Sequence, residues 1–181
     1  MKKKIIVGII LVVIITCGII VFLPSNEKCN DQALEFKKIY EEYNNRLLKL
    51  NIKDNNPMSK INKEDIIKKI DSSDGIIFFG SPNDNESRKL VRELLQVAPD
   101  YNCEVIYYYD FTKLDKNSEV FSKLKEKLGD NEFKSNIIIF YKKGEISKYI
   151  EYSKDIKEIK KNIIDGFDSI NGGMCEVAKQ C

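Results

Sequence analysis

The sequence predicts an α/β fold, a three-layer sandwich with a central mixed sheet, preceded by an N-terminal transmembrane helix. Short apolar runs of strand composition alternate with stretches whose apolar residues recur at helical spacing. The last two strand-like runs flank the sequence KKGE at 142–145, which is typical of a hairpin turn. The earlier strands are separated by helices, which is the connection typical of parallel strands, and the hairpin adds an antiparallel pair at the end. Three lysines at the start of the chain precede a long uncharged run.

That uncharged run extends from Ile5 to Leu23, which is 19 residues. A helix of this length would span about 28 Å, close to the thickness of the hydrocarbon core of a bilayer. No comparable basic cluster follows the run, so we expect 1–4 to be a cytoplasmic tip, 5–23 to anchor the chain in the lipid bilayer, and the rest to be extracellular. Two alternatives are a cleaved signal peptide, although no small-x-small site stands out near Leu23, and a lipoprotein acylated at Cys17.

Each remaining element is predicted from local pattern. Segment 24–61 is predicted to hold an amphipathic helix over 31–50 and then a polar linker. A domain over 62–170 is predicted to follow, and 171–181 forms a tail. In the domain we expect a short helix capped by Asn62, a strand at 76–79, a helix at 86–98, a strand at 103–111, a helix at 117–128 ended by Gly129, two hairpin strands, and a helix at 154–170 capped by Ser153.

Composition excludes several classes of function. The chain has no histidine, which argues against a Ser-His-Asp hydrolase and against a Cys/His zinc site. The net charge is +2, and without the three N-terminal lysines the 30 basic residues fall to 27 against 28 acidic ones. Such a balance gives no field that would hold a phosphate backbone, so no nucleic-acid partner is expected. No metal and no cofactor are predicted.

The exported part contains four cysteines in a compartment that permits disulfides. Cys29, Cys175 and Cys181 are candidates for disulfide bonds, either as a loop closed by Cys175 and Cys181 or as a link to Cys29. Cys103 opens a predicted strand, and we interpret it as a small buried apolar residue. Four cysteines allow three full pairings, and the sequence does not choose among them.

The stretch from Gly75 to Ala98, GIIFFGSPNDNESRKLVRELLQVA, carries a family resemblance. Phe79, Gly80, Pro82, Arg88 and Val91 match in order the end of the first core strand and the start of the following helix in thioredoxin-like proteins. The chain resembles the thioredoxin fold, and more narrowly the exported thioredoxin-like proteins of Gram-positive bacteria labelled bacteriocin transport accessory proteins. The resemblance covers about 62–170.

The chain departs from this family at the residues that perform its chemistry. Asp84 and Ser87 stand where the family has the two cysteines of Cys-x-x-Cys. Asn136, or Ser135, stands where it has the cis-proline that receives substrate backbone. A carboxylate is a poor nucleophile towards a disulfide and a serine hydroxyl is not ionised near pH 7, so we expect no redox activity here. Asp84 instead suits a helix cap.

Three hypotheses for function follow. The first is a non-catalytic binding or accessory module for an unknown protein or peptide partner at the cell envelope. Its binding surface is predicted to include Pro82, Asp84, Ser87, Asp110 and Asn136. The second is a thiol-disulfide oxidoreductase that uses Cys175 with Cys181, or either of them with Cys103. The third is a scaffold that assembles through the helix predicted at 31–50.

Overall fold

The structure is a computed structural model that describes residues 27–129, 133 and 135–170. The predicted anchor and the tail lie outside these residues. Within them, no helix is both long enough and apolar enough to cross a bilayer. The helices are α2 (Glu27–Glu41), α3 (Lys63–Ser72), α4 (Asn85–Val97), α5 (Glu119–Leu128) and α6 (Ile156–Ser169), with 3-10 turns η1 (Ala98–Tyr101) and η2 (Phe111–Lys113). The strands are β1 (Met58–Lys60), β2 (Gly75–Gly80), β3 (Ile106–Asp110), β4 (Ile137–Lys142) and β5 (Glu145–Glu151).

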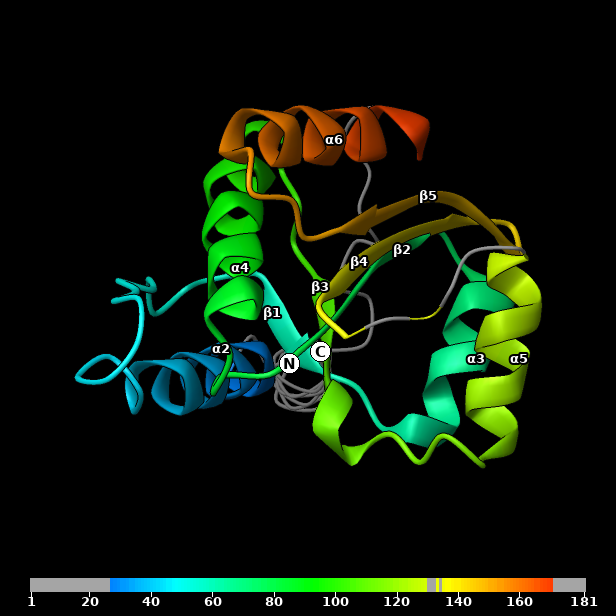
Figure 1. The fold of residues 1–181 in the computed structure, drawn as a ribbon, viewed down its shortest axis with the longest axis horizontal. Coiled ribbons are helices and arrows are strands. Elements are labelled where there is room, and N and C mark those ends of the chain that lie inside the picture. The colour runs from blue at the N-terminus through cyan, green and yellow to red at the C-terminus, as the bar shows by residue number, and fades with distance from the viewer. Residues whose placement is uncertain (1–26, 130–132, 134, 171–181) are drawn as a thin grey trace, which may run out of the picture.

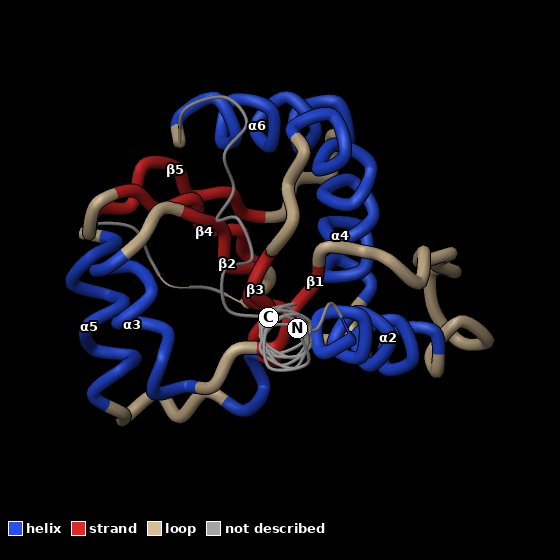
Figure 2. The backbone as a smooth tube through the Cα atoms, turned by 180° about the vertical axis from the view of Figure 1, so that it is seen from behind, coloured by secondary structure: helices blue, strands red, loops and turns tan. Residues whose placement is uncertain are grey.

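The five strands form one mixed sheet in the order β1-β3-β2-β4-β5. β1, β3 and β2 are parallel, whereas β4 is antiparallel to β2 and β5 is antiparallel to β4. Figure 1 shows α2, α4 and α6 on one face of this sheet and α3 and α5 on the other, and Figure 2 shows the same layers from behind. This is a thioredoxin-like α/β sandwich, so the predicted fold class is confirmed at that level.

Two apolar cores lie on the two faces of the sheet, because successive strand residues point to opposite sides. Phe78 and Tyr108 belong to the core under α2, α4 and α6. Phe79 and Tyr109 belong to the core under α3 and α5. The aromatic run of β3 therefore serves packing on both faces.

The predicted linker contains a strand. β1 lies within 24–61 and pairs in parallel with β3, Met58 opposite Ile106, so the sheet begins before Asn62. The alternation of polar and apolar residues was too short here to predict a strand, and the burial of Met58 becomes visible only in the sheet. The helix predicted over 31–50 ends at Glu41 and continues as turns.

The helix ends follow the expected chemistry with two exceptions. Gly129 ends α5 with a φ of 61°, and Gly144 occupies the hairpin turn with a φ of 89°. Asn62 stands at the start of α3, but its side chain accepts no capping hydrogen bond. The cap of α6 is Asp155, which accepts the Lys157 and Glu158 amides, and not Ser153.

Candidate functional site

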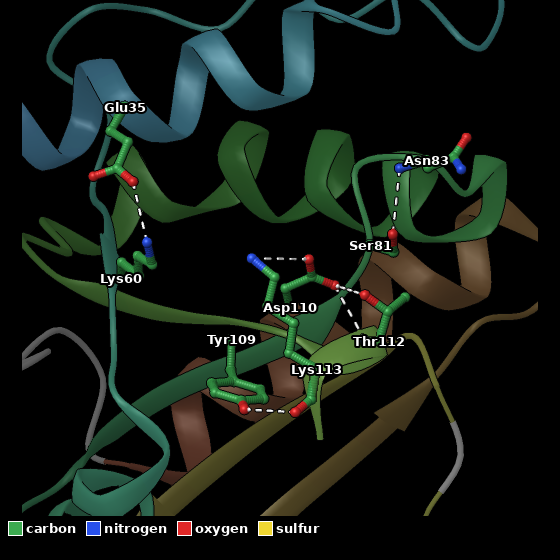
Figure 3. Close-up of polar contacts among 8 residues, drawn as sticks. All are labelled: Glu35, Lys60, Ser81, Asn83, Tyr109, Asp110, Thr112 and Lys113. Atoms are coloured by element: carbon green, nitrogen blue, oxygen red, sulfur yellow. Dashed lines mark hydrogen bonds and ion pairs between the residues drawn. The ribbon is translucent and has the colours of Figure 1, made fainter. Parts of the chain in front are cut away.

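The edge where β2 ends and α4 begins is the position that carries the reactive cysteines in the family resembled. Gly80, the last residue of β2, lies in register with Asp110, the last residue of β3. A turn over 81–84 then leads into α4. Figure 3 shows Ser81 and Asp110 side by side at this edge, with Lys60 of β1 paired to Glu35 of α2 beyond them.

Asp84 is the N-cap of α4, and both of its carboxylate oxygens are in use. Oδ1 accepts the amide hydrogens of Glu86 at 2.6 Å and Ser87 at 3.2 Å. Oδ2 accepts Nδ2 of Asn136 at 2.9 Å. Two residues that are 52 positions apart are thus joined by one hydrogen bond.

Asn136 directly precedes β4 and adopts a φ of 66°. Asparagine tolerates this left-handed conformation better than most residues. Its side chain is only 3% exposed, and the described residues contain no cis peptide bond. A proline, whose φ is fixed near about −65°, does not fit this backbone. The loop before β4 is therefore built differently from the loop that carries a cis-proline.

Ser87, at the position of the second cysteine, is fully buried beneath α2. Its hydroxyl shares a hydrogen bond of 3.2 Å with the hydroxyl of Tyr40, which is buried as well. A side chain at Gly80 would overlap the Phe78 ring and the Ser87 hydroxyl, so glycine is required at this close approach. Burial raises the pKa of Tyr40 well above its usual range, which keeps this pair uncharged.

Arg88 is also fully buried, and it holds the segment after α2 against the start of α4. Nε donates to the Leu48 carbonyl at 2.7 Å, and Nη1 donates to the carbonyls of Tyr40 at 2.6 Å and Pro82 at 3.0 Å. Nη2 donates to Oδ1 of Asn44 at 2.6 Å. Burial lowers the pKa of Arg88, while the Tyr40 hydroxyl acts to raise it. One of these acceptors, the Tyr40 carbonyl, lies in the last turn of α2, so Arg88 bonds to a carbonyl group at the end of that helix.

Asp110 is engaged within its own turn. Its side chain is 19% exposed, and Oδ1 accepts the backbone amide of Thr112 at 3.1 Å and the Thr112 hydroxyl at 2.7 Å. Lys113 lies 3.8 Å from the other oxygen. Figure 3 shows these contacts, together with the hydrogen bond from the Tyr109 hydroxyl to the Lys113 carbonyl. Asp110 thus caps η2.

The structure corrects the predicted binding surface. Pro82, Ser87 and Asn136 are buried, so they cannot contact a partner without rearrangement. Asp84 and Asp110 remain partly exposed. The role of Arg88 was not predicted, although the sequence holds one signal for it: Arg88 precedes Val91 by three residues, on the apolar face of α4. Among the described residues, no group of three His, Cys, Asp or Glu side chains is placed to hold a metal ion.

Cys103 is half-buried and disulfide-bonded, which corrects its interpretation as an unpaired apolar residue. Its partner lies outside the side chains that the structure describes. Cys103 follows the far end of α4, whose 13 residues separate it from Asp84 by about 20 Å of helix. The predicted pairings of Cys29, Cys175 and Cys181 lie outside the described residues and remain predictions.

Replacing Asp84 by Ala is expected to lower the free energy of unfolding by about 1–2 kcal/mol, because it removes the cap of α4 and leaves Asn136 Nδ2 without its acceptor. Urea denaturation followed by circular dichroism would measure this loss. Glu86→Ala is the matched control, since Glu86 is exposed in the same turn and its side chain caps nothing. Equal stability of the two variants would contradict a capping role for Asp84.

No family model and no curated protein sequence matches this chain. Solved structures do match, and one of them is oxidised thioredoxin O2 from Arabidopsis thaliana. That match has 16% sequence identity and a TM-score of 0.40, and it covers 61% of this chain and 94% of the thioredoxin. The fold assignment rests on the strand order and directions given above, because a similarity at this TM-score adds nothing to them.

Proposed function

We propose that this chain is a membrane-anchored, extracytoplasmic thioredoxin-like protein that performs no thiol exchange at the start of α4. It acts as a binding or accessory module for a protein or peptide at the cell envelope. The resemblance to bacteriocin transport accessory proteins suggests the setting, and the uncharged run from Ile5 to Leu23 supports the anchor and the export of the folded domain.

The observation that carries the proposal is the hydrogen-bonded pair of Asp84 and Asn136. Exchange needs a thiolate at the helix start, where free amide groups lower its pKa. Here those amides are occupied by the Asp84 carboxylate, and the position of the resolving thiol is a serine buried under Tyr40. The only cysteine among the described side chains, Cys103, lies beyond the other end of α4 and is already oxidised.

The full-length protein in detergent is expected not to accelerate the reduction of insulin by dithiothreitol. The double variant Asp84→Cys, Ser87→Cys is the positive control, because it places a thiol at the start of α4. We expect the new thiol at position 84 to titrate below the usual thiol pKa of about 8.5 and the variant to accelerate insulin reduction.

Acceleration by the unmodified protein would contradict the proposal. The variant Cys175→Ser, Cys181→Ser would then test the alternative function, since an oxidoreductase that uses the tail cysteines would lose its activity in this variant. Retained activity would instead point to the disulfide at Cys103.

A further inference from the structure

A groove of about 820 Å³ lies between the segment 49–57, the second half of α4 and η1. Its volume is within the range of about 300–1,000 Å³ that is typical of ligand sites. Val91 and Leu95 of α4 line one side, and Leu50, Ile52 and Pro57 line the other. The residues of α4 involved are in its middle and last turns, so the groove is separate from the edge at Asp84.

The deep part of the groove is apolar and its rim is polar. Leu50, Ile52 and Val91 are buried, whereas Leu95 is half-buried and able to contact a ligand. Exposed amide side chains lie at the rim, from Asn51 on the segment and from Gln96 on α4. An apolar floor with a few polar groups above it is the usual composition of a recognition site.

The charges around the groove are unbalanced. Lys49 and Lys53 are exposed and line it, and in the described part of the chain their ammonium groups form no hydrogen bond or ion pair. Arg92 also lines it, but its charge is paired with Glu93 at 2.8 Å. Among the described residues of the lining, Glu104 is the one acidic residue. The described part of the lining therefore carries a surplus of positive charge, on Lys49 and Lys53.

The wall formed by segment 49–57 is fixed before any ligand binds. Asn44 donates to the Leu50 carbonyl and accepts from the Leu50 amide, both at 2.9 Å. Asn56 donates to the carbonyls of Ala33 and Lys53 at 2.9 Å and accepts from the Met58 amide at 3.0 Å. A wall held in this way loses little conformational entropy on binding, which favours affinity.

We infer that this groove binds an extended acidic peptide segment of a partner protein. Its apolar side chains contact Leu95 and the floor, its carboxylates pair with Lys49 and Lys53, and its backbone bonds to the amide side chains at the rim. The inference goes beyond the proposed function because it concerns another surface. Peptide binding here and the absence of thiol exchange at α4 are measured separately and can fail separately.

The test uses fluorescence anisotropy with full-length protein in detergent and a fluorescein-labelled nonapeptide of three Leu-Glu-Gly repeats. The counterpart of three Leu-Lys-Gly repeats reverses only the charge. We expect the acidic peptide to bind at least about tenfold more tightly than the basic one, and to bind more weakly as salt rises. The variant Lys49→Glu, Lys53→Glu should reduce its affinity by at least about tenfold.

The control variant is Lys116→Glu, Lys154→Glu, which makes the same charge change at two exposed positions outside the groove. It should bind the acidic peptide as the unmodified protein does. Equal binding of both peptides, equal loss in both variants, or no binding would overturn the inference. Binding that appears only after residues 171–181 are deleted would also overturn it, because the chain's own tail would then be the occupant. Thermal melts of both variants would confirm that they are folded.

Discussion

Replacing Arg88 by Leu is expected to lower the free energy of unfolding by about 3–5 kcal/mol. The guanidinium is completely buried and donates to three backbone carbonyls and to the Asn44 side chain. A leucine fills much of the space but leaves the Pro82 carbonyl buried without a donor and the Tyr40 carbonyl with only the Tyr43 amide at 3.4 Å. A buried group that loses its donor costs about 1–3 kcal/mol. Urea denaturation, monitored by circular dichroism, would measure the loss.

Arg46→Leu is the matched control, because Arg46 lies in the same segment but is exposed, and its side chain forms no hydrogen bond or ion pair within the described structure. Its effect should stay within about 0.5 kcal/mol. Arg88→Lys should recover only part of the stability, since an ammonium group cannot reach acceptors on both sides as a guanidinium fork does. An Arg88→Leu variant as stable as Arg46→Leu would show that the segment after α2 is not held by this side chain.

The variant Cys103→Ser is expected to lose about 2–4 kcal/mol of unfolding free energy through loss of the disulfide. Reduction of the unmodified protein should cause a similar loss, whereas the variant should lose less when reduced. The measurement is urea denaturation with and without a phosphine reductant. Unchanged stability of the unmodified protein on reduction, or of the variant, would contradict a structural role for this bond.

The same variant identifies the partner cysteine. Mass spectrometry after alkylation without reduction should show one newly alkylated cysteine in Cys103→Ser, among Cys29, Cys175 and Cys181. If the other two are not alkylated, they are bonded to each other. The result would then identify which of the three possible pairings of the four cysteines is present. Alkylation of Cys103 in the unmodified protein would show that the bond is absent.

Ser87 and Arg88 are buried because the end of α2 and the segment after it cover the first turn of α4. In this chain the segment from Tyr40 to Leu48 packs on the first turn of α4, with the Leu48 amide donating to Oδ1 of Asn85 at 2.9 Å. The first turn of α4 is thus partly covered by the protein itself. At this edge a partner can contact Asp84, Asp110 and the exposed residues of the turn that joins β2 to α4. This surface is smaller than the one predicted from the sequence.

Local sequence determined the order of the elements and the absence of a Cys-x-x-Cys motif at the start of α4. The alternation of apolar runs, the hairpin at Gly144 and the acids at helix starts are signals within a few residues, so they predicted the strands β2 to β5, the turn and the cap at Asp84 correctly. That positions 84 and 87 hold aspartate and serine, and not cysteine, can likewise be read directly from the sequence.

The tertiary structure alone decided where these side chains lie and what they contact. Asn136 reaches Asp84 across 52 residues, Arg88 reaches Leu48 across 40, and β1 is a strand only because β3 offers it a partner. No local pattern specifies such pairs, because polar side chains such as those of Asn136 and Arg88 can also be hydrogen-bonded to water at the surface. Long-range packing turned Ser87 and Asn136 from expected surface residues into buried ones, because α2 and the loop before β4 close over the start of α4.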